Sequence, residues 1–155
     1  MSDTTGIDPR GPRFGAGITA ILLLVAIGLA VGGAQLPALI LFSAITLLFA
    51  WGAFAGVKRH PYGALYTRLL RPRLRPPTEL EDPVPPTFAQ GVGFVITLIG
   101  VALTLIGLPL ALPIAAGAAF IAAFLNSVFG YCLGCQIYLL LARFGVVGRN
   151  RPAAA

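Results

Sequence analysis

Two long stretches of the sequence carry no charged residue, and they constrain the fold more than any other feature. They run from Phe14 to Val57 and from Pro83 to Ala142. A helix needs about 20 apolar residues to cross the hydrocarbon core of a bilayer, so each stretch is long enough for two such helices. Only 10% of the residues are charged and 57% are hydrophobic. This composition excludes a disordered chain, a soluble domain of ordinary surface charge and a nucleic-acid-binding module.

Glycine and proline divide both stretches into halves. The sequence predicts turns at residues 32–37 and 107–113, because these residues interrupt helices. The membrane-spanning helices are therefore expected near the following ranges: 15–33, 37–56, 89–107 and 111–129. About a dozen apolar residues, 131–142, remain after the fourth span. They form an interfacial helix, a re-entrant segment or part of the fourth span, and the expected fold is an all-α membrane protein.

The positive charges are confined to three clusters, and the two short turns carry none. All 11 Lys and Arg residues fall at Arg10 and Arg13; at Lys58, Arg59, Arg68, Arg71, Arg73 and Arg75; and at Arg143, Arg149 and Arg151. The positive-inside rule then places both termini and the central loop in the cytoplasm. A fifth span would export the last three arginines. We therefore expect a multi-pass protein of the inner (cytoplasmic) membrane with four spans.

The segments before the first and third predicted helices resemble one another. A shift of 74 positions matches Asp8-Pro9 with Asp82-Pro83, and it also matches the Pro-x-Phe that follows each pair. We expect two tandem two-helix repeats, about residues 8–72 and 82–145, with a linker at about 73–81 and a tail at 146–155. Each hairpin is followed by an amphipathic run, 62–71 or 136–144, that suits a short interfacial helix.

The only two cysteines form a C-x-x-C motif, Cys132 and Cys135. At this spacing two sulfurs can form a disulfide or bind one soft metal ion. The predicted topology places the pair on the cytoplasmic side, where the environment is reducing. A dithiol or a metal thiolate is therefore the expected resting state. We expect Cys132 to be the attacking thiol and Cys135 the resolving one.

Neighbouring cations can stabilise a thiolate. The 74-residue shift carries Lys58 onto Cys132, so Lys58, Arg59 or His60 is expected to do this. The alternatives left open are that His60 contacts lipid headgroups, that Lys58 and Arg59 only set the topology, and that the cysteines pack as small apolar residues. Metal binding is the weaker prediction, since His60 alone could join Cys132 and Cys135 within one chain.

Other polar and aromatic residues around the fourth span and the two candidate loops are candidate supporting residues. Their functional role is either direct participation in the site or, for the amides, bridging between helices. They are Tyr62, Tyr131, Asn126 and Gln136.

Four pieces of the sequence resemble a bacterial membrane family catalogued as domain of unknown function four-three-nine-five. They are Asp8 to Phe14, His60-Pro61-Tyr62, Leu80 to Gln90 without Val84, and Gly130-Tyr131-Cys132-Leu133-Gly134-Cys135. Members of that family are often encoded near thioredoxin-like or rhodanese-like proteins, so the resemblance implies thiol or sulfur traffic at the membrane. The resemblance implies that the family's His-Pro-Tyr motif and two cysteines correspond to His60, Pro61, Tyr62, Cys132 and Cys135. It implies no established mechanism.

The resulting functional hypothesis is a membrane thiol protein that exchanges disulfides or relays persulfide sulfur. The expected partners are the lipid bilayer, a cytosolic thioredoxin-like or rhodanese-like protein and further copies of the chain, with no nucleic acid and no cofactor. Two alternatives stay open: an oligomeric transporter or channel for a sulfur-containing solute, and a membrane anchor for a soluble enzyme. The sequence does not decide whether the protein is an enzyme.

Overall fold

A computed structural model describes residues 6–147, and this part of the chain is helical. Six α-helices follow one another: α1 (Arg10–Val31), α2 (Gln35–Ala55), α3 (Pro61–Leu69), α4 (Val84–Leu105), α5 (Ala111–Phe129) and α6 (Leu133–Arg143). Two 3-10 turns lie at Val57–Arg59 and Arg71–Arg73. Within residues 6–147 the only β-type pairing is an isolated bridge between Ile7 and Glu81, which ties the linker to the start of α1. Arg149 and Arg151 lie outside the described residues.

The four long helices α1, α2, α4 and α5 are long and apolar enough to cross a membrane, which confirms the expected number of spans. The second and fourth spans agree closely with the expected ranges. The first and third begin about five residues earlier, at Arg10 and Val84. The reason is local: Asp8 and Asp82 each accept a hydrogen bond from the backbone N–H two residues later, 3.0 Å long in both cases, which supports an early helix start.

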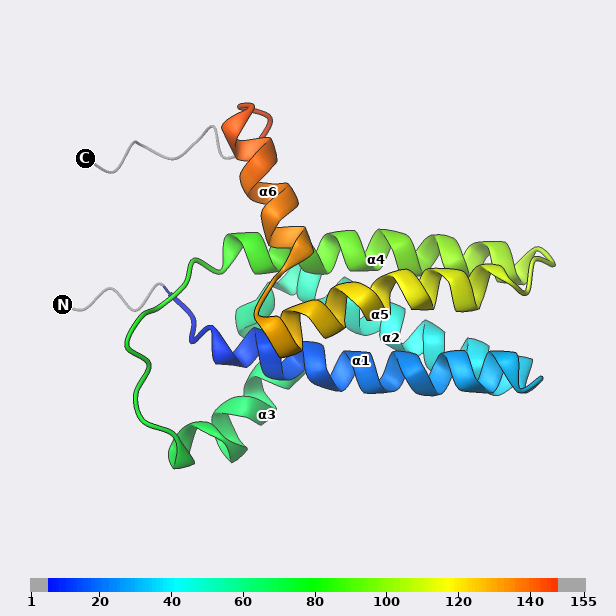
Figure 1. Ribbon diagram of the computed structural model, residues 1–155, viewed down its shortest axis with the longest axis horizontal. Coiled ribbons are helices and arrows are strands. Elements are labelled where there is room, and N and C mark those ends of the chain that lie inside the picture. The colour runs from blue at the N-terminus through cyan, green and yellow to red at the C-terminus, as the bar shows by residue number, and fades with distance from the viewer. Residues whose placement is uncertain (1–5, 148–155) are drawn as a thin grey trace.

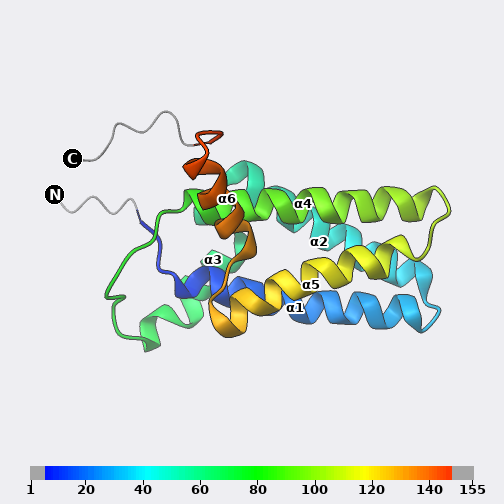
Figure 2. The ribbon, with the colours of Figure 1, turned by 45° about the horizontal axis from the view of Figure 1, so that its top comes forward.

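The long helices form a bundle with two distinct ends (Figure 1). Both hairpin turns lie at one end, whereas α3, α6 and the linker lie at the other, and a second view shows the same arrangement (Figure 2). Helix α1 packs chiefly along α5, and α2 packs along α4. We call the end with α3 and α6 the charged end, because the turns at the opposite end, 32–34 and 106–110, carry no charge.

Two short helices follow the hairpins, as the sequence predicts. Helix α3 packs on α1, and α6 packs on α4 and leaves the axis of α5 at an angle, so residues 133–143 do not continue the fourth span (Figure 1). Helix α6 begins three residues earlier than the expected 136–144. Each short helix buries one tyrosine: Tyr66 lies 6.0 Å from Phe14 between ring centroids, and Tyr138 lies 5.5 Å from Phe88.

The close-packed core occupies the half of the bundle nearest the hairpin turns. Its fully buried large side chains include Leu23 of α1, Phe42 and Ile45 of α2 and Leu112 of α5. The surrounding helix positions hold alanine and glycine, which permit close helix contact in the absence of a hydrophobic driving force between spans. Outward-facing positions are mostly large and apolar, as a lipid-facing surface requires.

Phe42→Ala should destabilise the protein much more than Phe54→Ala. Phe42 is fully buried in the core, whereas Phe54 is 80% exposed. Removing a buried phenylalanine ring leaves a cavity and costs roughly 3 kcal/mol, while the exposed ring is replaced by lipid or detergent contacts. Denaturant titration in detergent micelles measures both free energies of unfolding, and equal losses would contradict the assigned core.

Candidate thiol site

The C-x-x-C motif lies where one helix ends and the next begins. Gly130 ends α5 in the left-handed conformation, with φ 68°. The N–H of Gly130 bonds to the carbonyl of Asn126 (3.0 Å), and that of Tyr131 bonds to Leu125 (3.1 Å). This arrangement of bonds closes a helix and favours glycine at the left-handed position. Cys132 is then the N-cap of α6, and Cys135 lies in its first turn.

The two cysteines are joined as a disulfide, with Cα atoms 5.2 Å apart. The Cys135 N–H also donates a hydrogen bond to the Cys132 sulfur, 3.2 Å away. The N-cap geometry turns the Cys132 side chain back over the first turn, where Cys135 lies, so the two sulfurs are close enough for the disulfide that the C-x-x-C spacing permits. The dithiol or metal thiolate expected as the resting state stays a prediction. Both residues are half-buried, whereas Tyr131 beside them is exposed.

Gly134, between the cysteines, holds α6 tightly against α4. A Cβ atom on Gly134 would come within 2.5 Å of both the Cα and the Cβ of Ala89. Such a distance to backbone cannot be relieved by a side-chain rotation. The glycine therefore fixes the distance between the cysteine turn and α4, and it explains why small residues occur at both positions.

The cysteine turn lies at the mouth of a cavity of about 710 Å³, which we call the thiol cavity. The cavity brings together four of the sequence-predicted site residues: Cys132, Cys135, Asn126 and Gln136. Five polar residues that the prediction had missed also line it, namely Arg13, Thr19, Gln90, Glu81 and Asp82. Gln90 belongs to the Phe-Ala-Gln piece of the family resemblance and Arg13 to the Asp-Pro piece, so both lay within motifs already noted.

Arg13 is the cation that the structure places beside the cysteine turn. Its Nη2 atom lies 3.5 Å from the carbonyl oxygen of Ser127 and 3.4 Å from that of Val128, at the last turn of α5. A cation is favourable at the C-terminal end of a helix. The guanidinium also lies against Gly130, with its Cζ atom 3.4 Å from where a Cβ would be. It therefore reaches the turn that leads directly into Cys132.

His60 has a different surrounding from the one expected. It is buried, and it lines a second cavity of about 380 Å³ that also contains Lys58 and Tyr62 but neither cysteine. Its Nδ1 accepts the N–H of Tyr62 (3.2 Å), so the neutral ring donates from Nε2 to the carbonyl of Leu48 (3.0 Å). Both ring nitrogens are thus occupied by backbone groups, and burial holds the pKa of His60 below its ordinary value.

Lys58 and Arg59 are exposed in the 3-10 turn before α3. The carbonyl of Arg59 accepts a hydrogen bond from the indole N–H of Trp51, 3.0 Å long. The structure therefore groups Lys58, Arg59, His60 and Tyr62 with α3 and not with the cysteine turn. That one of these residues stabilises a thiolate stays a prediction, and the cation that lies beside the turn is Arg13.

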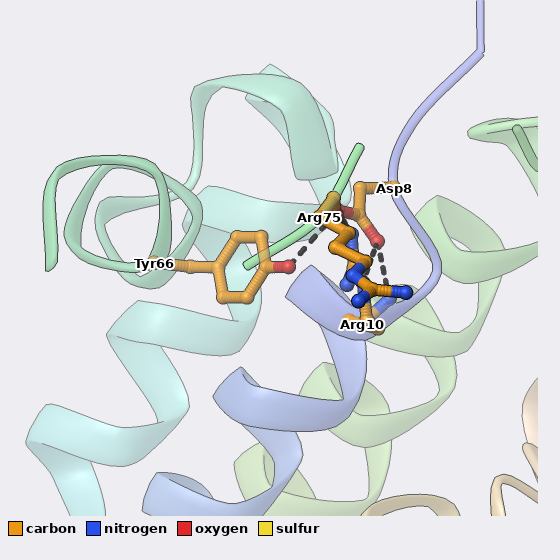
Figure 3. Close-up of polar contacts among 4 residues, drawn as sticks. All are labelled: Asp8, Arg10, Tyr66 and Arg75. Carbon is orange, nitrogen blue, oxygen red and sulfur yellow. Dashed lines mark hydrogen bonds and ion pairs between the residues drawn. The ribbon is translucent and has the colours of Figure 1, made fainter. Parts of the chain in front are cut away.

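The second cavity is bordered by a polar cluster that joins three segments (Figure 3). Asp8 forms an ion pair with Arg10 (2.8 Å) and accepts a hydrogen bond from the buried Tyr66 hydroxyl (2.9 Å). Arg10 also donates to the carbonyl of Arg75 in the linker (3.0 Å). The hydrogen bonds from Arg10 lower the pKa of Asp8. This cluster fixes the start of α1, α3 and the linker to one another.

A metal site of the kind considered from the sequence is not assembled. Across residues 6–147, no three His, Cys, Asp or Glu side chains lie close enough together to hold a metal ion. The set of Cys132, Cys135 and His60 fails because the histidine faces the second cavity. The chemistry that the thiol cavity offers is therefore that of two sulfurs, a nearby guanidinium, two carboxylates and three side-chain amides.

Gly134→Ala should destabilise the protein, whereas Gly117→Ala should leave stability unchanged or raise it. Both glycines are helical, but a Cβ at Gly117 meets nothing within 4 Å. Alanine gains about 1 kcal/mol of helix propensity over glycine, whereas at Gly134 the clash with Ala89 costs up to about 3 kcal/mol, which exceeds this gain. Thermal unfolding in detergent tests the opposite signs, and a stabilised Gly134→Ala variant would contradict the close contact of α6 with α4.

The stability of the charged end should fall as the pH is lowered from 7 to 5. The folded-state pKa of His60 is held below 6.5, so the unfolded chain binds a proton that the folded chain does not. The loss should be no more than about 1.4 kcal/mol per pH unit. His60→Asn should keep the N-cap and remove this slope. His60 is the only histidine, so an unchanged slope in the variant would show that the histidine is not its source.

Comparison with known proteins identifies the family of the chain but not its activity. The family model described as "Domain of unknown function (DUF4395)" matches residues 7–143. No curated protein and no solved structure matches the sequence. The match covers all six helices and both cysteines, and it confirms the family that the motifs had suggested. The chain belongs to the DUF4395 family.

Proposed function

We propose that this protein is a membrane thiol–disulfide exchange protein and that its Cys132–Cys135 pair cycles between the disulfide and the dithiol. The observation that carries the proposal is the position of the pair at the N-terminus of α6, with the Cys132 sulfur accepting the Cys135 N–H (3.2 Å). The pair also lines a cavity and lies among the charges of the bundle. A pair buried only for packing would need none of these features.

The N-cap position suits Cys132 for the attacking role. In the reduced protein its thiolate would be stabilised by the Cys135 N–H, by the N-terminal end of α6 and by the nearby Arg13. In the exchange, a thiolate of the partner attacks one sulfur of the pair and forms a mixed disulfide, and the other sulfur of the pair leaves as a thiolate. A second partner thiol then completes the transfer, so the partner is oxidised to a disulfide and the pair is reduced by two electrons.

The charge distribution supports a cytoplasmic position for the charged end. Within residues 6–147, the cations flank α1, α3 and α6 at this end, and the hairpin turns carry none. By the positive-inside rule, the cysteine turn then faces the cytosol of a bacterial cell. A thioredoxin-like protein that supplies or receives thiol electrons is the partner that fits this chemistry. A rhodanese-like partner would use the same two cysteines to pass persulfide sulfur.

Similar contacts in the two halves support a tandem repeat. The Phe14–Tyr66 contact of the first half has a counterpart in Phe88–Tyr138 of the second. Helix α1 contacts α5 and α3, and α4 contacts α2 and α6. The order of the helices, long, long and short, is also the same in each half.

The N-caps of the two short helices refine the alignment of the halves. His60 caps α3 and Cys132 caps α6, and each side chain accepts a backbone N–H. These two residues are 72 positions apart, whereas the spans align at 74. The counterpart of Cys132 is therefore His60 and not Lys58. On this alignment a polar N-cap is common to both halves, and only the second half carries sulfur chemistry.

The halves differ in what occupies the space beside the first helix. In the first half the Tyr62 ring lies 3.2 Å from where a Cβ on Gly15 would be, and in the second Gly134 lies against Ala89. At the 72-residue alignment Tyr62 corresponds to Gly134. The second half thus has a glycine hydrogen where the first half has a tyrosine ring. The cavity beside Gly134 has a volume of about 710 Å³, whereas the cavity beside Tyr62 has a volume of about 380 Å³. This difference supports a specialised role for the second half.

Cys135→Ala should trap the protein in mixed disulfides with its partner. In this variant the Cys132 thiolate attacks the disulfide of the oxidised partner, forms a mixed disulfide and releases one partner thiol. The mixed disulfide persists because this chain has no second sulfur to displace it. The complexes are isolated from cells after acid quenching and alkylation, and the partner is identified by mass spectrometry after reduction. We expect a soluble protein with a thioredoxin-like or rhodanese-like fold.

Cys132→Ala is the matched control, and it should trap much less. If neither variant captures a thiol protein, the exchange function is wrong. If a partner still binds and the cellular phenotype persists when both cysteines are serine, the protein acts as an anchor instead. Uptake of a sulfur-containing solute into sealed vesicles that survives the same double substitution would favour a transporter.

A further inference from the structure

The thiol cavity extends far below the cysteine turn. Its walls reach Ile96 in the middle of α4 and Ala118 in the middle of α5. Helix α5 leans away from α4 towards α1 as it approaches the charged end, and both views show this divergence (Figures 1 and 2). The thiol cavity therefore lies within the membrane-spanning half of the protein, with the disulfide at its mouth.

The deep part of the thiol cavity is neutral and mostly apolar. No charged residue occurs between Pro83 and Ala142 or between Phe14 and Val57, so the charges that line the cavity are confined to its mouth. Below them the walls combine small residues with Phe49, Ile96 and Thr19; the small ones include Ala16, Gly93, Ala119, Ala122 and Ala123. Ala118 is exposed on the lipid-facing surface, so a lipid-soluble molecule can enter at that level. The cavity volume is within the range of small-molecule sites.

Three side-chain amides line the thiol cavity, and none of them makes a hydrogen bond to another part of residues 6–147. Gln136 is exposed in the first turn of α6, whereas Gln90 of α4 and Asn126 of α5 are half-buried on the two long helices. No fully buried side-chain polar atom of residues 6–147 lacks a partner, so the two half-buried amides are open to the cavity and can donate to a molecule within it. These two donors therefore indicate a ligand that carries hydrogen-bond acceptors on an otherwise apolar body.

The geometry points to a membrane quinone as the ligand of the thiol cavity and as the oxidant of the reduced Cys132–Cys135 pair. A quinone is neutral and lipid-soluble, and its two carbonyl oxygens can accept the amide N–H groups of Gln90 and Asn126. Its apolar tail would lie along the alanine-lined wall towards Ala118. This inference rests on the proposed function, because it supplies the step that regenerates the disulfide.

The redox step balances within the two molecules. Two S–H bonds of the dithiol break and the Cys132–Cys135 S–S bond forms. The two electrons and two protons pass to the quinone, whose carbonyl oxygens become the hydroxyl groups of a quinol. The quinol then leaves towards the lipid. A partner dithiol reduces the disulfide again at the charged end, so electrons flow from the soluble partner to the membrane quinone.

The test uses the purified full-length protein in detergent micelles, reduced and freed of reductant without oxygen. The probe is a fully substituted benzoquinone with a short apolar tail, which cannot alkylate thiols. We expect one quinone to be reduced for every two thiols lost, measured by quinone absorbance and by the mass shift after alkylation. Thiol loss without quinol formation, or no thiol loss at all, would overturn the inference.

A filled cavity provides the specific variant. Ala122→Phe should slow oxidation by the quinone by about tenfold or more, and Ala44→Phe, on an exposed position of α2 outside the cavity, should not. Gln90→Leu should raise the quinone concentration needed for half-maximal rate by about tenfold, the effect of one lost hydrogen bond. Oxidation by the water-soluble reagent diamide should be the same in all variants, which shows that the dithiol itself is intact.

The outcomes separate this inference from the proposed function. One outcome is that the quinone oxidises the dithiol equally fast in Ala122→Phe and in the unaltered protein, or in neither, while Cys135→Ala still traps a thiol partner. The cavity then does not bind a quinone, and the exchange function stands. If trapping also fails, the proposed function is wrong as well. If oxidation of the dithiol by the quinone depends on the cavity but no partner is trapped, the quinone site stands and disulfide exchange with a protein partner is wrong.

Discussion

Lipid offers no hydrogen-bond partner to a backbone amide and no stabilisation to a charge, and the whole arrangement of this protein depends on that fact. Backbone groups within the bilayer must be satisfied inside helices, so each uncharged stretch folds as a hairpin of two long helices. Buried hydroxyls follow the same constraint: Thr46 and Thr97 donate to carbonyls of their own helices. The charges, the short helices α3 and α6 and the cysteine turn are left together at one end of the bundle, where water can reach them.

Small side chains decide where the bundle is closed and where it is open. Near the hairpin turns the helices pack around Phe42, Leu23 and Leu112 and leave a dense core. Towards the charged end α5 follows α1, and the space beside α4 is lined largely by alanine and becomes the thiol cavity. Gly134 keeps α6 pressed on α4 at the mouth of this cavity. One packing scheme thus yields a densely packed half and a half with a cavity beside two sulfurs.

Much of this architecture could be predicted from the sequence, because hydropathy and charge are properties of consecutive residues. The four spans and the two short helices were expected, and the errors were confined to helix starts governed by Asp8, Asp82 and Cys132. The residues around the cysteines were harder to predict. The 74-residue shift suggested Lys58 as the counterpart of Cys132, whereas the N-caps align at 72 and give His60.

The contact partners of the cysteine turn depend on how distant helices cross, which no local pattern reveals. Arg13 lies more than a hundred residues from Cys132 in the chain, yet it contacts the end of α5 immediately before the turn. Gln90 and Ala89 reach the thiol cavity only because α4 and α6 pack together. Both ring nitrogens of His60, in contrast, are hydrogen-bonded to backbone groups of Leu48 and Tyr62. These contacts join segments that are far apart in the sequence.

The central claim is that Cys132 and Cys135 form a cycling thiol pair at the cytoplasmic end of the bundle. Thiol labelling in living cells tests this most directly, with permeant and impermeant maleimides applied before and after mild reduction. The account predicts that the impermeant reagent modifies neither cysteine in intact cells, and that the permeant reagent modifies a fraction that increases after reduction. Labelling by the impermeant reagent in intact cells, or no labelling of either cysteine until the protein is denatured, would contradict it.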